Sequence, residues 1–266
     1  MIVLFVVLAL SGLAWLAIII ALLARAILSP PRMTDGRATY LLHRLSPGDL
    51  GLDFENENFV IRDARDGKRL HIAGWWMPGR VDDGHCAILL HGYGDAKVGS
   101  IAVAPLLHRL GLNVLAIDLR AHGESGGSHC TAGFFERDDV CQIIDQLLVN
   151  RPRETQQIIL VGTELGATVA AATAAQRDDV AAVVLDSPFV DYRQSVTSHA
   201  DLIGMPRGPI LQLALAYAEF ISGAKFDQVC PTDIIAKLQC PVLLVATGDV
   251  NYENKLANFL TVELAK

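Results

Sequence analysis

The apolar positions of the chain begin with one unbroken run. Residues 1–24 contain no charged side chain, and only Ser11 and Gly12 in this stretch are not apolar. As a helix rising ~1.5 Å per residue, the run would extend ~36 Å, which exceeds the ~30 Å hydrocarbon core of a bilayer. A secretory signal peptide would instead carry a basic start and a shorter apolar core. The pattern therefore predicts an uncleaved transmembrane anchor over residues 1–28, ended by Ser29-Pro30-Pro31.

The charges beside this run predict which side of the membrane carries the rest of the chain. Arg25, Arg32 and Arg37 follow the apolar run, and no charged side chain precedes it. By the positive-inside rule we expect a single-pass protein that contacts membrane lipid through its N-terminal helix and keeps its remaining domain in the cytoplasm. Residues 29–55 show no clear hydrophobic period, which predicts a polar linker.

From residue 56 onward, apolar runs of strand length alternate with helical patterns. The expected strands are residues 59–62, 69–76, 86–90, 113–117, 158–161, 181–185 and 240–246, and the expected helices are residues 101–110, 134–148, 167–175 and 253–264. This alternation predicts an α/β fold with a mostly parallel central sheet and helices on both faces. An Asp-Gly pair in residues 65–68 predicts a hairpin between the first two strands. We expect one domain over residues 56–266, with a small cap-like insertion at about residues 190–230.

The charge and the cysteine content exclude several function classes. The net charge is −7 and no long basic run occurs, so the chain lacks the electrostatic footprint of nucleic-acid binding. The five cysteines are widely scattered and form no Cys-x-x-Cys pair, so neither a zinc site nor a disulfide framework is expected. The sequence gives no sign of a metal site or an organic cofactor.

One stretch carries the pattern of a catalytic turn. Residues 158–161 have strand character, residues 167–175 are a small-residue helix, and Gly162 and Gly166 bracket the turn between them. Strand, sharp turn and helix with glycines four residues apart is the frame of the Gly-x-Ser-x-Gly nucleophile elbow. The central position of this frame, where serine is expected, holds Glu164.

Three segments in this order and spacing resemble the α/β-hydrolase superfamily. They are His91-Gly92-Tyr93-Gly94, the run from Asp118 to Ser125 (DLRAHGES), and Gly162-Thr163-Glu164-Leu165-Gly166. The sequence is most similar to the serine aminopeptidase/monoglyceride lipase-like branch, many of whose members carry an N-terminal membrane anchor. The resemblance covers about residues 56–250. It implies the α/β-hydrolase fold and a small ester, lipid or peptide as the ligand.

The resemblance also implies roles for individual residues. The backbone N–H groups of Tyr93 and Leu165 are the expected oxyanion-hole donors, and such donors do not depend on side-chain identity. The residues expected to form the framework of the motifs are His91, Gly92, Gly94, Asp118, Arg120, His122, Gly162 and Gly166.

Two interpretations of Glu164 remain open. A carboxylate can serve as a nucleophile, as aspartate does in related dehalogenases and epoxide hydrolases. Glutamate is one methylene longer, however, and a misplacement of ~1 Å can cost ~10²-fold in rate. Alternatively, the Glu164 carboxylate fills the oxyanion hole itself by reaching the N–H groups of Tyr93 and Leu165.

The acid and the histidine of a hydrolase triad are harder to place. The resemblance puts the acid at Asn251, with Asp249 as a near alternative and Asp186 as another. No histidine follows His199 in the sequence, so we expect the final strand and its histidine loop to be missing. Residues 241–245 of the last expected strand would then be an exposed apolar edge of the sheet.

Three hypotheses follow for function. The first is a membrane-anchored pseudoenzyme that keeps the hydrolase pocket but has lost turnover, because serine is replaced by Glu164 and the final histidine is absent. The second is an active hydrolase of small esters, lipids or peptides that uses Glu164 as nucleophile or base. The third is a shortened gene product with little function.

Overall fold

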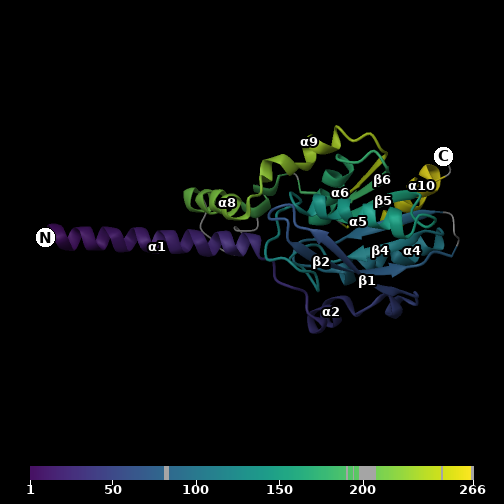
Figure 1. Ribbon diagram of the computed structural model, residues 1–266, viewed down its shortest axis with the longest axis horizontal. Coiled ribbons are helices and arrows are strands. Elements are labelled where there is room, and N and C mark those ends of the chain that lie inside the picture. The colour runs from purple at the N-terminus through teal and green to yellow at the C-terminus, as the bar shows by residue number, and fades with distance from the viewer. Residues whose placement is uncertain (81–83, 190, 194, 198–207, 247, 265–266) are drawn as a thin grey trace.

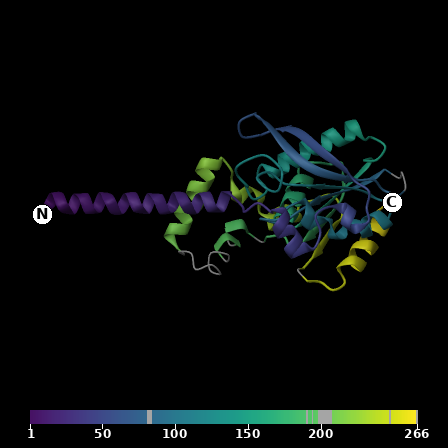
Figure 2. The same ribbon diagram turned by 90° about the horizontal axis from the view of Figure 1, so that it is seen from below.

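The computed structural model describes residues 1–80, 84–189, 191–193, 195–197, 208–246 and 248–264. One long helix, α1 (Ile2–Leu28), projects from an α/β domain, and a second helix, α8 (Pro209–Ser222), lies beside the base of α1 (Figures 1 and 2). The predicted anchor over residues 1–28 thus coincides with one continuous helix, which is long and apolar enough to cross a membrane.

The domain is built on a single mostly parallel sheet. Its strands are β1 (Glu55–Arg62), β2 (Arg69–Met77), β3 (His85–Leu90), β4 (Asn113–Ile117), β5 (Gln157–Thr163), β6 (Val180–Asp186) and β7 (Val242–Val245). Their spatial order is β1-β2-β4-β3-β5-β6-β7. β1 and β2 form the predicted antiparallel hairpin, β2 pairs antiparallel with β4, and every later pair is parallel. The predicted α/β class is confirmed.

Helices cover both faces of this sheet. They are α2 (Asp35–Leu42), α3 (Lys97–Ser100), α4 (Ala104–Arg109), α5 (Glu136–Asn150), α6 (Leu165–Ala174), α9 (Pro231–Ile235) and α10 (Tyr252–Glu263), with short 3₁₀ turns η1 (Pro47–Leu50), η2 (Ile101–Val103) and η3 (Phe226–Val229). Strand β3, in the middle of the sheet, has apolar side chains on both of its faces. Cys86, Ile88 and Leu90 pack with α5 and α6, while Ala87 and Leu89 pack with α4 and α10. Alternate side chains of a strand point to opposite faces, so a strand buried on both sides reads as one continuous apolar run.

The segment predicted as a linker, residues 29–55, is packed onto the domain. It contains α2, whose first turn is capped by the Thr34 side chain accepting the N–H of Arg37. Ala38 is buried in the core, and the Arg44 guanidinium donates to the backbone carbonyls of Val98 and Gly99 at 3.1 Å. An eight-residue helix with one buried position has too few apolar residues to show a period in the sequence.

The cap-like insertion predicted at residues 190–230 contains α8 and η3, while residues 198–207 and His199 within them lie outside the described residues. The inner face of α8 packs on the last turns of α1. The buried residues of this contact are Leu23, Ala24, Ile27, Leu28, Leu211, Ala214, Leu215 and Ala218. The insertion is therefore attached to the apolar N-terminal helix as well as to the domain.

Strand β7 lies at the edge of the sheet in the part of the chain that the structure describes. It pairs with β6 from Val242 to Val245, and the side chain of Leu244 is 59% exposed. This matches the exposed apolar edge expected for residues 241–245.

Candidate functional site

The turn between β5 and α6 has the backbone of a nucleophile elbow. Glu164 adopts φ 50° and ψ −108°, a region that costs a residue with a side chain about 1–3 kcal/mol. Two hydrogen bonds hold it there: the Glu164 N–H donates to the carbonyl of Asp186 at 2.8 Å, and its own carbonyl accepts the N–H of Thr168 at 3.2 Å. The strand, turn and helix predicted from the glycine spacing are present.

The two bracketing glycines are required by close backbone approaches. A Cβ on Gly162 would lie 2.2 Å from the carbonyl oxygen of Gly166. A Cβ on Gly166 would lie 2.0 Å from the carbonyl oxygen of Leu90, at the end of β3. Real Cβ contacts do not reach such distances, so the turn packs against the end of β3 only because both positions lack a side chain.

The Glu164 side chain lies against the loop that follows β3. A Cβ built on Gly92 would be 2.8 Å from Oε2 of Glu164, so the carboxylate rests over the backbone of that glycine. Gly92 immediately precedes Tyr93, whose N–H is an expected oxyanion donor, and Leu165 is buried as the first residue of α6. The structure thus brings Glu164 together with the predicted oxyanion loop. The oxyanion role of Tyr93 and Leu165 stays a prediction.

His91 holds this loop to the end of β4. Its Nε2 accepts the backbone N–H of Leu119 at 3.0 Å, so the ring proton lies on Nδ1, which donates to the carbonyl of Gly92 at 2.8 Å. Burial, followed by the neighbouring His122, lowers the pKa of His91 to about 3. His91 is therefore neutral at physiological pH, and both of its nitrogens are used to fix the loop.

His122 packs between the same elements. Its ring makes edge contacts with the rings of His91 and Tyr93, at centroid separations of 4.9 and 5.9 Å. Its Nδ1 contacts the carbonyl oxygen of Arg120 at 2.9 Å, and burial lowers its pKa. His122 thus supports the Tyr93 loop from behind.

Asp118 organises the loop that follows β4, and its partner Lys97 was not anticipated from the sequence. Lys97 gives Asp118 two bonds of 2.7 Å, one from its backbone N–H and one from its Nζ. The Glu124 N–H donates to the same carboxylate at 3.0 Å, and a Cβ on Gly123 would collide with it. A buried lysine requires such a partner. In the sequence, Lys97 lies 21 residues before Asp118, and no local pattern connects the two.

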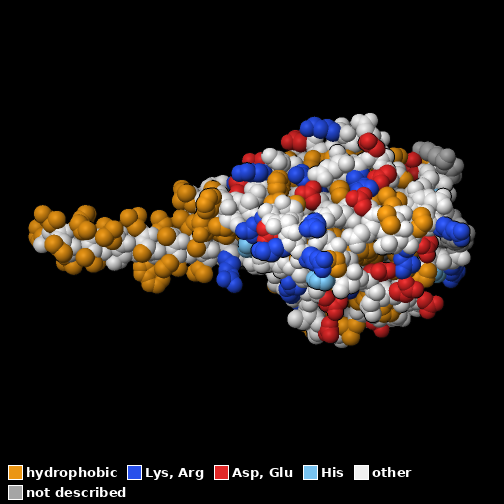
Figure 3. Space-filling view, viewed as in Figure 1, with side chains coloured by type: hydrophobic (Ala, Val, Ile, Leu, Met, Phe, Trp, Pro, Cys, Tyr) orange, Lys and Arg blue, Asp and Glu red, His pale blue; other side chains and the backbone are white. Residues whose placement is uncertain are grey.

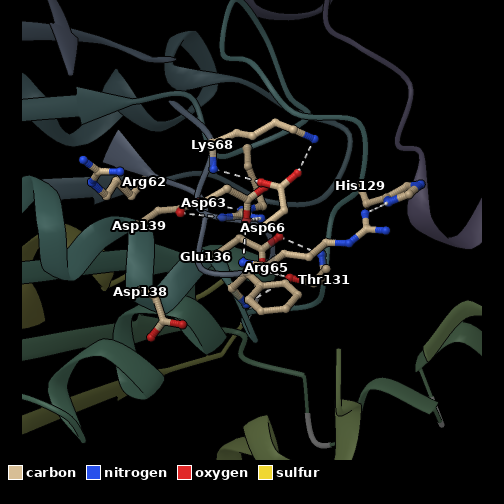
Figure 4. A network of polar contacts seen from close by, with 12 residues as sticks. Arg62, Asp63, Arg65, Asp66, Lys68, His129, Thr131, Glu136, Asp138 and Asp139 are labelled. Atoms are coloured by element: carbon tan, nitrogen blue, oxygen red, sulfur yellow. Dashed lines mark hydrogen bonds and ion pairs between the residues drawn. The ribbon is translucent and has the colours of Figure 1, made fainter. Parts of the chain in front are cut away.

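Arg120 ties the same loop to α5 and to the β1–β2 hairpin. Its guanidinium binds both carboxylate oxygens of Asp139, at 2.5 and 2.6 Å, and reaches Asp63 at 3.1 Å. The guanidinium also lies 5.4 Å from the ring centre of Phe135. Burial alone would lower the pKa of Arg120, but the hydrogen bonds and charge of Asp139 raise it above its ordinary value. Figure 4 shows Asp63 and Asp139 in this polar network.

The end of α1 forms part of the surroundings of the site. Tyr93 Oη donates to the carbonyls of Ala26 and Ile27 at 3.3 and 3.2 Å, and Tyr192 Oη donates to that of Ile27 at 3.4 Å. The last four carbonyls of a helix have no partner within the helix, so these phenols satisfy groups that would otherwise need water. The loop expected to bind an oxyanion is thereby bonded directly to the N-terminal helix.

Arg32 makes a second connection that the sequence did not reveal. Its guanidinium donates to the carbonyls of His122, Gly123, Ser125 and Gly127 at 2.6–3.2 Å. In the sequence, Arg32 is only one of the charges that follow the apolar run. Its role depends on backbone carbonyls about ninety residues away, which leave no sequence signal.

The predicted acid positions lie at the start of α10. Asn251 is exposed at the N-cap, where its N–H donates to Oδ1 of Asp249 at 2.9 Å. The other oxygen of Asp249 pairs with Lys255 at 2.5 Å, and this hydrogen bond lowers the pKa of Asp249. Asp249 is thus engaged with the first turn of α10. An acid role for either residue stays a prediction.

Asp186 lies nearer the elbow than the α10 residues do. It ends β6 opposite Thr163, and Ser187 Oγ donates to it at 2.8 Å. It also borders a cavity of about 180 Å³ together with Thr163 and Tyr252. Burial, with a smaller effect of Asp186, raises the pKa of Tyr252 to about 12. Among the described residues no group of His, Cys, Asp and Glu side chains is arranged to hold a metal ion.

The strain at the elbow predicts a reversed preference for glycine. Glu164→Gly should be about 1 kcal/mol more stable than Glu164→Ala, because only glycine adopts φ 50° without steric cost. At Ala216, an exposed position of the α8 helix, Ala→Gly should instead destabilise by about 1 kcal/mol. Urea unfolding of the full chain in detergent micelles measures both differences. If glycine were less stable than alanine at position 164 as well as at position 216, the turn would not be strained.

Comparison with known proteins identifies the family. A family model described as "Serine aminopeptidase, S33" matches residues 84–225, which is more than half of the chain. The protein YqkD of Bacillus subtilis is 29% identical over 203 residues, which cover 74% of this chain and 64% of YqkD. A multifunctional-autoprocessing repeats-in-toxin protein of Vibrio cholerae is 28% identical over 138 residues, which cover 50% of this chain and 3% of the toxin. The chain therefore spans less than two thirds of these relatives.

Solved structures show the same fold. The esterase Pf2001 of Pyrococcus furiosus superposes with a TM-score of 0.66 at 20% identity, covering 90% of this chain and 98% of the esterase. An α/β-hydrolase of Vibrio vulnificus gives a TM-score of 0.57 at 19% identity, covering 92% and 81% of the two chains. The sheet order, the elbow geometry and the family match agree, and the chain belongs to the serine aminopeptidase (S33) family of α/β-hydrolases.

Proposed function

We propose that the chain is a membrane-anchored α/β-hydrolase-fold protein with little or no hydrolytic turnover, because Glu164 takes the place of the serine nucleophile. The observation that carries this proposal is the position of the Glu164 carboxylate. The residue sits at the strained apex of the elbow, and its Oε2 rests against Gly92, the residue before the expected oxyanion donor Tyr93. The ligand we propose for the retained pocket is a small ester, lipid or peptide.

The chemistry of a carboxylate supports impaired turnover. A serine that attacks an ester forms another ester, so the step is nearly balanced in energy. A carboxylate that attacks the same carbonyl forms a mixed anhydride and must expel an alkoxide, which is a far poorer leaving group than the carboxylate itself. The tetrahedral intermediate therefore returns to the starting ester rather than going forward.

Electrostatics acts in the same direction. The transition state for ester hydrolysis places negative charge beside the backbone donors of the oxyanion hole. A second negative charge ~4 Å away, at an effective dielectric constant of ~20, costs ~4 kcal/mol. That cost corresponds to ~10³-fold in rate. A carboxylate at position 164 that rests against Gly92 would oppose the charge that this loop stabilises in a serine enzyme.

The membrane attachment rests on α1 and on the charges that follow it. The side chains from Ile2 to Ile19 are exposed and apolar almost throughout, whereas the last turns of α1 are buried on the domain. A helix of this composition is stable in lipid and unfavourable in water. Arg25 lies near the end of α1 and Arg32 and Arg37 follow the helix, so by the positive-inside rule the domain lies on the cytoplasmic side.

The test is hydrolysis of short- and long-chain activated esters by the full chain in detergent micelles. We expect the rate to stay within about twofold of that of Glu164→Ala, because no bond-forming role is lost. Turnover that appears only in Glu164→Ser would identify Glu164 as the residue that silences an otherwise competent site. Glu164→Gln is the matched control, since it keeps the size of the side chain and removes its charge.

A second candidate function is favoured by the intact elbow. Because the turn still presents side chain 164 at its apex, Glu164 can act as a nucleophile or general base in an active hydrolase. In that case Glu164→Ala and Glu164→Gln should both lower a measurable wild-type rate by at least ~10²-fold. This result would replace the proposal above.

A further inference from the structure

The outer face of α8 is apolar and exposed. Leu213, Tyr217 and Phe220 are 51%, 39% and 82% exposed, and their spacing of i, i+4 and i+7 places them on one face of the helix. The one charged residue of α8, Glu219, is turned to the domain, where it pairs with Arg193 at 2.6 Å and accepts the Phe226 N–H at 2.9 Å. This face of α8 therefore carries no charge.

The outer face of α8 continues an apolar surface of α1. Beside the α1–α8 contact, Ile18, Ile19 and Leu22 of α1 are 48%, 39% and 62% exposed. Figure 3 shows apolar side chains covering the projecting helix and the adjoining α8 region, and Lys and Arg side chains where α1 meets the domain. A contiguous exposed surface of this kind on two packed helices marks a contact with a partner or a membrane.

The length of α1 sets the depth at which α8 lies. At ~1.5 Å per residue, the part of α1 from residue 2 to residue 22 extends ~31 Å, which matches a ~30 Å hydrocarbon core. The contacts of α8 reach up α1 as far as Ile20, just inside the end of that span. Because α8 is ~10 Å across and packs at this height on α1, its outer face lies at the boundary of headgroups and acyl chains. Interfacial helices bury their apolar face to a similar depth of ~5–10 Å.

Polar contacts fix α8 in this position. Arg65, from the β1–β2 hairpin, donates to the carbonyl of Ile221 at 2.8 Å, in the last turn of α8. The same guanidinium contacts His129 Nδ1 at 3.3 Å, as Figure 4 shows. Arg25 in the last turn of α1 and Lys225, three residues after the end of α8, are both exposed, and cations there can pair with phospholipid phosphates. Polar contacts with the domain thus hold the α8 surface in place.

We propose that the outer face of α8, formed by Leu213, Tyr217 and Phe220, is a second membrane-contact element. It rests in the headgroup–acyl boundary of the leaflet from which α1 emerges, and its partner is the phospholipid leaflet itself. The inference rests on the proposed anchor role of α1. Because Tyr93 is bonded to the last turn of α1, this contact holds the loop beside Glu164 close to the membrane surface.

Quenching of tryptophan fluorescence by brominated phospholipid tests the proposal. The full chain is reconstituted in phosphatidylcholine vesicles with bromines either near the headgroup or deep in the acyl chain. In a Trp15→Phe background, the fluorescence that Phe220→Trp or Leu213→Trp adds to that of the buried Trp75 and Trp76 should be quenched at least about twofold more by the shallow than by the deep lipid. Val149→Trp is the matched control, because Val149 is 77% exposed near the end of α5 that leads into the start of β5, away from the elbow.

The two quenchers separate this proposal from the anchor. Native Trp15 lies within the exposed part of α1 and should be quenched by the deep lipid if α1 spans the bilayer. Quenching of Trp15, together with α8 probes that behave like Val149→Trp, would keep the anchor and overturn the α8 contact. Loss of quenching at Trp15 as well would overturn both.

Discussion

Replacing Arg120 by methionine is expected to lower the free energy of unfolding by about 3–5 kcal/mol. The side chain of Arg120 is 5% exposed and that of its bidentate partner Asp139 is 4% exposed. Methionine fills much of the same volume but provides no hydrogen-bond donor. The substitution leaves the Asp139 carboxylate in the interior without its counter-charge, and an unpaired buried charge is among the most costly defects in a folded protein.

The size of this effect comes from the stranded carboxylate rather than from the ion pair itself. The free-energy cost of desolvating both charges nearly cancels their mutual attraction. Removing both members of the pair therefore destabilises the fold much less than removing one. We therefore expect Asp139→Leu to restore much of the stability of Arg120→Met. The remaining acceptor, Asp63, is 21% exposed and can be hydrated.

Arg177→Met is the matched control for this measurement. Arg177 also pairs with two carboxylates, Asp145 at 2.7 Å and Asp179 at 2.6 Å, but their side chains are 64% and 44% exposed. Water hydrates these carboxylates when the arginine is removed, so the loss should stay below ~1 kcal/mol. Urea unfolding in detergent micelles, followed by near-ultraviolet circular dichroism, compares the variants. A loss for Arg120→Met no larger than that for Arg177→Met would contradict the explanation.

The elements that could be predicted from the sequence are those whose pattern is local. Strand β3 is apolar throughout because both of its faces are buried, and the strand, turn and helix around Glu164 are marked by Gly162 and Gly166. In each case the residues that create the signal are neighbours in the chain. The same locality explains why the β1–β2 hairpin was predicted from its Asp-Gly turn.

The parts of the site that escaped prediction depend on distant partners. Lys97 is buried because Asp118 meets it, and Arg32 matters because it reaches four carbonyls beyond residue 121. A single charged residue looks the same in a sequence whether it is solvated or bonded. The helix α2 was missed for a related reason, since only Ala38 of its eight residues is buried. The contacts of Lys97 and Arg32 and the position of α2 all depend on tertiary packing, which produces no periodic pattern in the sequence.

The acid position is one for which the sequence left several candidates. It offered Asn251, Asp249 and Asp186, and none of them is tested as the acid. In the fold, Asp249 binds Lys255 and the N–H of Asn251, while Asp186 lies beside the elbow at the end of β6. The carboxyl ends of neighbouring parallel strands meet at one edge of the sheet, so strand ends predict proximity better than residue counts do.

The second large effect is expected at Gly166, where alanine should lower the free energy of unfolding by about 3 kcal/mol, the upper end for overpacking. The new methyl group would lie 2.0 Å from the Leu90 carbonyl oxygen and 2.4 Å from its carbon. Both are backbone atoms of β3, which is paired on both sides by β4 and β5. Because the sheet holds them in place, α6 must move away and expose the core beneath it.

Gly36→Ala is the control, because Gly36 lies in α2 with no atom within 4 Å of the added Cβ. There alanine should stabilise the protein by about 0.5–1 kcal/mol through helix propensity. Opposite signs at the two glycines, read from urea unfolding in micelles, would show that the elbow glycines are required by packing alone. That requirement is the same whether or not residue 164 performs chemistry, so an elbow of intact geometry is compatible with a site that has lost its serine. A stable Gly166→Ala variant would instead mean that β3 and α6 are not in the contact described.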